Sequence, residues 1–163
     1  MYHLSFPFSD NLQEMLTVSE LLECNEFTSR YGLRLEQQQA CHLAEVRKQS
    51  LTGNGRIEFG GGILRKLVIS FCDSPYLSQA EYADTLATLT SLFFYYKNES
   101  LDAINDNDLL NFMKQHFDTD CHGSIELLVR DLDWLVHHLF AEGENKPCFD
   151  SRDNYLYWGE FDE

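Results

Sequence analysis

The sequence of 163 residues is poor in several features that define common protein classes. It has only three prolines, Pro7, Pro75 and Pro147, so long stretches are free to form helices. Its five cysteines are widely spaced without a Cys-x-x-Cys pair, which favours free thiols in a reducing compartment. No apolar run approaches the about 20 residues of a membrane span, and no basic stretch followed by an apolar run opens the chain. We therefore expect a soluble cytoplasmic protein.

Positive charge is also scarce, and it is unevenly distributed. The chain has 12 Lys and Arg against 27 Asp and Glu, a formal net charge of −15. Residues 102–163 hold 15 acidic and four basic side chains, whereas residues 30–66 hold seven basic and three acidic ones. This balance opposes direct binding to nucleic acid and docking on anionic membranes. It favours a basic protein partner, or simple solvation.

Apolar residues recur at helical spacing along most of the chain. The hydrophobic content of 44%, with 12 Phe and 8 Tyr, is sufficient for a buried core. We predict an all-α fold, an irregular bundle of five or six helices. The predicted helices cover residues 10–24, 36–51, 63 to just before Pro75, 78–97, 106–117 and 124–141.

The predicted inward faces follow from the same spacing. In the first helix they include Leu12, Met15, Leu16 and Leu22, and in the third helix Ile63, Leu64, Leu67, Val68 and Phe71. The sequence SQAE at 78–81 has the capping-box pattern that begins a helix, and Asn-Gly at 54–55 ends one. The run FFYY at 93–96 fits a central helix, although any exposed part of it would mark an interface.

Residues 56–59 alternate polar and apolar side chains and are the best candidate for a short strand. The last residues, 144–163, return to aromatic side chains among acids. Two alternatives stay open for them: residues 155–158 pair with 56–59 as a minor two-stranded β element, or the tail is solvated and docks on a partner. We predict a single helical domain over 1–143, followed by an acidic aromatic tail over 144–163.

The glycine run Gly60, Gly61 and Gly62 is the sharpest local feature. Glycines before a helix let the backbone approach a ligand, and the helix N-terminus offers free N–H groups to an anion. Arg56 and Arg65 add positive charge nearby. However, the run lacks a Gly-Lys-Ser/Thr or G-x-G-x-x-G pattern, and a tight junction would need glycine as well. Packing is the favoured interpretation, and an anion site at these five residues is the alternative.

Cysteine and histidine are neighbours at Cys41–His42 and at Cys121–His122. Thiolate and imidazole are ligands that zinc prefers, but adjacent residues rarely bind the same tetrahedral ion, and no close second pair completes a set. Buried thiols and surface histidines are the simpler interpretation. We predict no metal, no cofactor and no catalytic residue. If the protein were an enzyme, Cys72 or Cys121 would be its candidate nucleophile.

Several stretches together resemble an uncharacterised family of small bacterial (Firmicutes) proteins, a domain of unknown function. They are CNEF at 24–27, RIEFGGG at 56–62, FCDSPY at 71–76, YYKNE at 95–99 and CHGS at 121–124. The resemblance spans about residues 12–140, and the tail lies outside it. It implies a bacterial, intracellular, single-domain protein. It implies no activity, cofactor or site residue.

The expected function is a non-catalytic intracellular protein-interaction module. Its acidic surface, chiefly residues 102–163, would bind a basic or complementary protein, with Tyr155, Tyr157, Trp158 and Phe161 as aromatic anchors. A nucleic-acid-binding protein would be one such partner if the carboxylates are spaced like phosphates. The alternative is a small-ligand or anion-binding protein, or an enzyme, with its site at the glycine run.

Overall fold

The computed structural model describes residues 7–58 and 62–141, with the side chains from residue 12 onward. Six longer helices, a four-residue helix and a 3₁₀ turn make up this part, which contains no β-strand, so the predicted all-α class is confirmed. The elements are α1 (Pro7–Glu23), α2 (Asn25–Thr28), η1 (Ser29–Tyr31), α3 (Gln37–Gly53), α4 (Gly62–Phe71), α5 (Tyr82–Glu99), α6 (Asp106–Asp118) and α7 (Ile125–Ala141). The domain boundary predicted after residue 143 lies outside the described residues.

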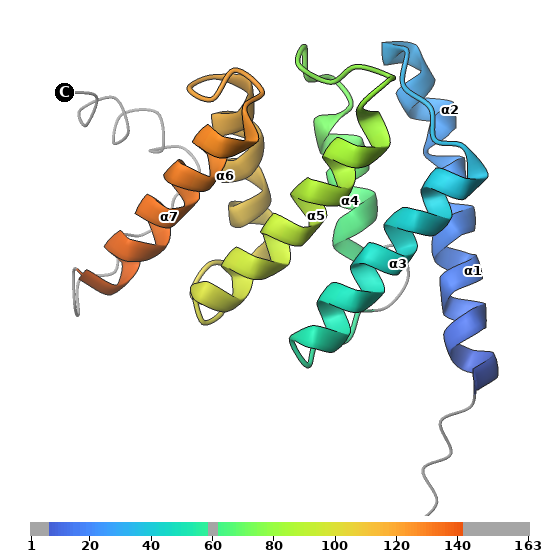
Figure 1. Cartoon of the computed structure of the whole chain (residues 1–163), viewed down its shortest axis with the longest axis horizontal. Helices are drawn as coiled ribbons and strands as arrows, with labels where there is room; N and C mark the ends of the chain where they lie inside the picture. Colours follow the sequence, from blue (N-terminus) through green and yellow to red (C-terminus); the bar gives the residue numbers. More distant parts are fainter. Residues whose placement is uncertain (1–6, 59–61, 142–163) are drawn as a thin grey trace, which may run out of the picture.

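The helices lie in a row, with α1 and α3 at one end, α6 and α7 at the other, and α4 and α5 between them (Figure 1). The middle helices serve two hydrophobic clusters at once. Ile63, Leu67 and Phe71 of α4 pack with α5, α6 and α7. Leu64 and Val68 pack with residues of α1, α3 and α5. The wide apolar stripe predicted for α4 is therefore confirmed. The stripe is wide because α4 packs against both hydrophobic clusters.

Within the described residues, no helix has both the length and the apolar character needed to cross a bilayer.

The predicted inward face of α1 is confirmed only at Leu22, which is partly buried against the cluster that holds Leu21. Leu12, Met15 and Leu16 are exposed, Met15 to 68%, whereas Leu21 and Thr17 face α3 and α4 and are buried. Thr17 tolerates burial because its hydroxyl donates to the Gln13 carbonyl at 2.9 Å. Figure 1 shows the reason for the shift: α1 and α3 cross at an angle and diverge toward the N-terminal end of α1. Among the described residues, no helix lies opposite the apolar stripe at that end.

The capping box predicted at 78–81 is also wrong. These residues form a turn in which the Glu81 amide donates to the Ser78 carbonyl at 3.1 Å, and α5 begins only at the buried Tyr82. A capping contact is found instead at α3, where the Glu36 amide donates to the Gln39 side chain at 2.9 Å. Local pattern alone does not distinguish a cap from a turn that precedes a helix.

Residues 56–58 form a connector and not a strand, so the strand predicted over 56–59 is not present in its described part. The predicted end of α3 is confirmed: Gly55 has φ +64°, and the Arg56 amide donates back to the Leu51 carbonyl at 2.8 Å. The connector runs between helices, and its side chains bond to those helices and not to a neighbouring strand. Its predicted partner, residues 155–158, lies outside the described residues.

Candidate functional site

The start of α4, where the sequence suggested an anion site, holds a carboxylate of the same chain. One Glu58 oxygen accepts a hydrogen bond from the Ile63 amide at 3.2 Å, and the other accepts from Arg47 Nε at 3.0 Å. Gly62 has φ +51°, and a Cβ there would lie 2.8 Å from the Glu58 carboxylate. The helix N-terminus and a guanidinium thus bind an anion that the chain supplies. Gly60 and Gly61 lie outside the described residues.

The two arginines predicted for that site lie apart. Arg56 Nε donates to Asn98 Oδ1 at 2.8 Å, and its guanidinium pairs with Asp102 at 2.8 Å. The hydrogen bond from Arg56 lowers the pKa of Asp102 below its ordinary value. Arg65 is exposed on α4, where it and Gly62 line an open groove of about 730 Å³ together with α6. The structure therefore brings Gly62 and Arg65 together but directs Arg56 toward α5.

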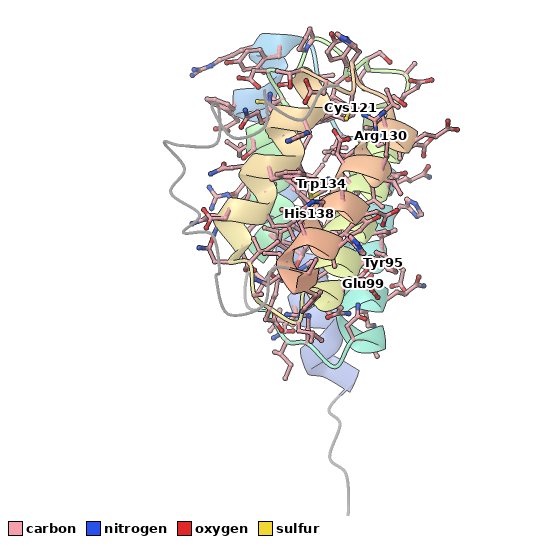
Figure 2. All side chains as sticks on the ribbon, turned by 90° about the vertical axis from the view of Figure 1, so that its left-hand side faces the viewer. Tyr95, Glu99, Cys121, Arg130, Trp134 and His138 are labelled. Carbon is pink, nitrogen blue, oxygen red and sulfur yellow. The ribbon has the colours of Figure 1, made fainter. Side chains whose placement is uncertain are left out.

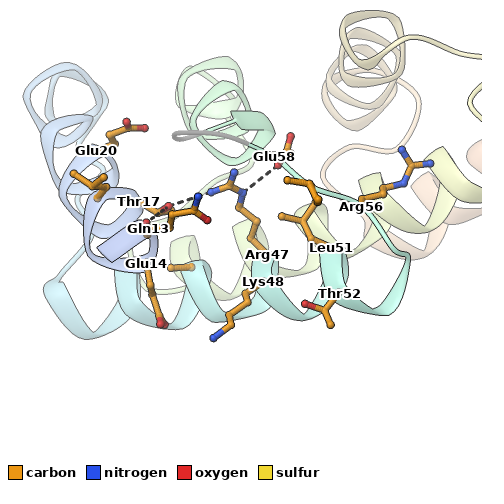
Figure 3. A pocket seen from close by; sticks show the side chains of 13 residues that line it. Gln13, Glu14, Thr17, Glu20, Arg47, Lys48, Leu51, Thr52, Arg56 and Glu58 are labelled. Atoms are coloured by element: carbon orange, nitrogen blue, oxygen red, sulfur yellow. Dashed lines mark hydrogen bonds and ion pairs between the residues drawn. The ribbon is translucent and has the colours of Figure 1, made fainter. Parts of the chain in front are cut away.

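A cavity of about 360 Å³ opens where α1 and α3 diverge, and residues 56–58 line it as well (Figure 3). We call it the α1–α3 cleft. Arg47, only 6% exposed, spans its inner wall and bonds to Glu58 and, through Nη1, to the Thr17 hydroxyl at 3.1 Å. Leu16 and the 81% exposed Ile57 add apolar surface. The cleft is thus amphipathic, and the charge of its buried arginine is paired within the chain.

A second concave surface of about 440 Å³ lies between α5 and α7, and we call it the α5–α7 groove. Tyr95 and Glu99, one turn apart on the outer face of α5, form one wall, and Figure 2 shows them together beside α7. Residues of α7 at helical spacing form the other wall. The lining residues are Tyr95, Tyr96, Glu99, Asp133, Val136, His137, Phe140 and Ala141.

The groove combines exposed aromatic rings with carboxylates. Tyr95 is 54% exposed and Phe140 is 53% exposed. The Tyr96 hydroxyl donates to Asp133 Oδ1 at 2.6 Å, which fixes the position of that carboxylate. Burial, and after it the bond to Asp133, raises the pKa of Tyr96, so the hydroxyl remains a donor at neutral pH. Glu99 is exposed on the same side.

The α5–α7 groove is also acidic. No Lys or Arg is among its lining residues, and Glu99 and Asp133 form no ion pair with another described residue. The nearby basic side chains that the structure describes are engaged elsewhere. Lys97 pairs with Asp106, Lys114 with Asp73 and Asp118, and Arg130 with Asp131.

The cysteines considered as nucleophiles are buried. Burial, and after it the charge of Asp73, raises the pKa of Cys72. Burial, and after it the charge of Asp131, raises the pKa of Cys121 to about 12. Both surroundings favour the protonated thiol, whereas a nucleophilic cysteine reacts as the thiolate.

Sequence reasoning missed most of the groove. It noted the run at 93–96, and the structure buries Phe93, Phe94 and Tyr96 but leaves Tyr95 at the surface. Phe140 carried no signal, because an apolar residue near the end of an amphipathic helix is ordinarily core. The predicted anchors in the tail, Tyr155, Tyr157, Trp158 and Phe161, lie outside the described residues.

Comparison with known proteins gives a family and no function. Residues 20–144 match a family described as a family of unknown function, DUF6323. No curated protein and no solved structure matches the chain. The resemblance to an uncharacterised family is therefore confirmed.

Proposed function

Since the chain belongs to this family of unknown function, we propose its role from its own surface: it is a non-catalytic protein-interaction module that binds a basic protein segment in the α5–α7 groove. The observation that carries the proposal is the combination of Tyr95 and Phe140 with Glu99 and Asp133, with no Lys or Arg among the lining residues.

Lysine and arginine side chains suit such a surface for three reasons. Their charge is attracted to the face of an aromatic ring, by about 0.5–1 kcal/mol at exposed sites. A carboxylate accepts charge-assisted hydrogen bonds from the same cation. Asp133 is already held by the Tyr96 hydroxyl, so less side-chain freedom is lost when a partner binds.

Residues 144–163 follow α7 closely in the sequence and carry more acidic and aromatic side chains. In this proposal the tail residues Tyr155, Tyr157, Trp158 and Phe161 extend the binding surface. A nucleic-acid-binding protein is one partner with the required basic surface. We also propose that the protein acts in the cytoplasm, because its four described cysteines are free and Cys41 is exposed.

Binding of defined peptides tests the groove directly. Fluorescence anisotropy would compare Lys- and Arg-rich peptides with neutral peptides of the same length, using the full chain. We expect binding of the basic peptides, weaker at higher salt, and a loss of fivefold or more (about 1 kcal/mol) in the variants Tyr95→Ala and Glu99→Gln. Glu126→Gln, an exposed carboxylate of α7 outside the groove, is the matched control.

Two results would contradict this proposal. One is the absence of any preference for basic peptides. The other is an equal loss of affinity in Glu126→Gln and Glu99→Gln, because binding would then depend on the net charge of the protein and not on the groove. A chain ending at residue 141 separates the contribution of the tail from that of the groove.

The second candidate function is binding of a small ligand, and the α1–α3 cleft is the observation that favours it. Its volume of about 360 Å³ falls in the range of small-molecule sites, about 300–1,000 Å³. A thermal-shift screen with carboxylated and phosphorylated metabolites tests it, since a specific ligand raises the melting temperature. A shift that Leu16→Ala abolishes would support this function, and no shift with any ligand would contradict it.

A further inference from the structure

A cluster of potential metal ligands lies where α6 turns into α7, away from the α5–α7 groove. His116 belongs to the last turn of α6, Asp120 to the connecting turn and Asp131 to α7. One donor atom from each lies within 4.8 Å of the other two. His116 Nδ1 is 2.8 Å from Asp131 Oδ2 and 3.5 Å from Asp120 Oδ2. Figure 2 shows this end of α7, marked by Cys121 and Arg130, well separated from Tyr95 and Glu99.

The backbone of the turn places these residues together. The Cys121 amide donates to the His116 carbonyl at 2.9 Å, and the Gly123 amide donates to the Phe117 carbonyl at 2.8 Å. These bonds close the end of α6 around Gly123, which has φ +77°. The tight reversal brings Asp120 beside the last turn of α6, while α7 folds back and presents Asp131 to the same imidazole.

We propose that His116, Asp120 and Asp131 bind a zinc ion. Zinc bonds to histidine nitrogen and carboxylate oxygen are about 2.0–2.2 Å long, so tetrahedral donors lie about 3.3–3.6 Å apart. The His116–Asp120 separation already has this value, and the His116–Asp131 pair needs to open by about half an ångström. Imidazole favours zinc over magnesium and calcium, which prefer oxygen ligands alone. Three protein donors leave the fourth position to water.

The surroundings of the cluster support this assignment. Nε and Nη2 of Arg130 donate to Asp131 Oδ1 at 3.1 and 3.0 Å, which turns the other oxygen, Oδ2, toward His116. The Phe112 ring stacks on the imidazole at a centroid distance of 4.0 Å. The Cys121 thiol donates to Asp131 Oδ2 at 3.4 Å. Groups in these positions orient the ligands of metal sites.

Zinc titration of the metal-stripped full chain tests the proposal. Isothermal titration calorimetry should give one zinc ion per chain, and zinc should raise the melting temperature where equimolar magnesium does not. Asp120→Asn removes an exposed ligand without disturbing the core, and we expect at least a tenfold loss of zinc affinity. Glu126→Gln and His42→Gln, an exposed carboxylate and an exposed histidine outside the cluster, are matched controls that should bind as the wild type does.

Several outcomes would overturn the site. They are the absence of stoichiometric zinc binding, an unchanged affinity in Asp120→Asn, and an equal loss in either control variant. Zinc-edge X-ray absorption of the complex gives a second readout: only nitrogen and oxygen donors are expected, and a sulfur neighbour would contradict the three-ligand set. These measurements do not depend on peptide binding in the groove, so the zinc site and the proposed function are tested independently.

Discussion

The α1–α3 cleft and the α5–α7 groove are both concave, but their charges are arranged differently. In the cleft, Arg47 is paired with Glu58, and Arg56 is directed away to Asp102. In the groove, Glu99 and Asp133 face the surface and form no ion pair with another described residue. Residues 30–66 are the basic part of the sequence, yet two of their seven basic side chains, Arg47 and Arg56, are paired with carboxylates of the same chain. The charge counted along a chain is therefore a poor guide to the charge available to a partner.

The same contrast determines what each charge contributes to stability. A buried ion pair that loses one partner leaves an uncompensated charge, which costs about 3–5 kcal/mol. An exposed pair contributes only about 0–1 kcal/mol. The buried Arg47–Glu58 pair of the cleft should therefore hold the fold together, and the carboxylates of the groove should be free for binding.

The largest expected effect tests the cleft side. Glu58→Gln removes the carboxylate that binds both Arg47 and the start of α4, and we expect a loss of about 3 kcal/mol in the free energy of unfolding in urea. Glu23→Gln, an exposed carboxylate of α1, is the control and should change stability by less than about 0.5 kcal/mol. If both variants lost the same free energy of unfolding, the proposed difference in stability contribution between buried and exposed charges would be contradicted.

The next effect tests the turn between α6 and α7, where a close backbone approach holds Gly123 against Tyr76. A Cβ on Gly123 would lie 2.4 Å from Tyr76 Cβ, at φ +77°, so Gly123→Ala should cost about 2–3 kcal/mol. Gly32 has nearly the same φ, +76°, with open space around it. Gly32→Ala should therefore cost only the backbone part, about 1–2 kcal/mol. If the two variants had the same melting temperature, the contact of the new Cβ with Tyr76 would not be the cause of the destabilisation.

The smallest effect concerns the exposed pair that joins the two sides. Asp102→Asn removes the charge that binds Arg56 but suits the local φ of +59°, which asparagine tolerates. We expect a loss of about 0.2–1 kcal/mol at neutral pH. Because Arg56 lowers the pKa of Asp102, this contribution is present above the ordinary aspartate pKa and is lost as the pH falls through the lowered value.

The difference between Asp102→Asn and the wild type should therefore vanish in acid. Urea titrations at a series of pH values measure it. Glu99→Gln, which removes a carboxylate without an ion pair among the described residues, is the control and should show no such pH-dependent difference. A difference that stays constant down to acid pH would mean that the ion pair contributes nothing.

The helices were predictable from the sequence where one apolar stripe faces one core. Leu128, Leu132 and Leu135 of α7 are buried as their spacing indicates. The face of α1 was not predictable, because two neighbouring stripes compete and only the crossing angle with α3 selects between them. The short strand at 56–59 failed for a related reason, since period-two alternation also occurs in a connector whose side chains alternate between helices.

The candidate sites were harder to predict from the sequence than the helices. Arg47 and Glu58 are 11 residues apart, and Arg56 and Asp102 are 46 apart, so neither pairing follows from local spacing. Burial of Lys97 beside Asp106 likewise depends on the fold as a whole. The two exposed aromatic residues of the groove lie on different helices, and only the packing of α5 on α7 brings them to one surface.

The contact between Glu58 and the start of α4 also limits what else binds there. A carboxylate five residues from the amide it occupies in the same chain has an effective concentration in the millimolar range or above. A free anion at micromolar levels cannot compete with it for the Ile63 amide and the Arg47 guanidinium. Replacing Glu58 would remove this competitor, and the same two donors would then become available to a phosphate or carboxylate from solution.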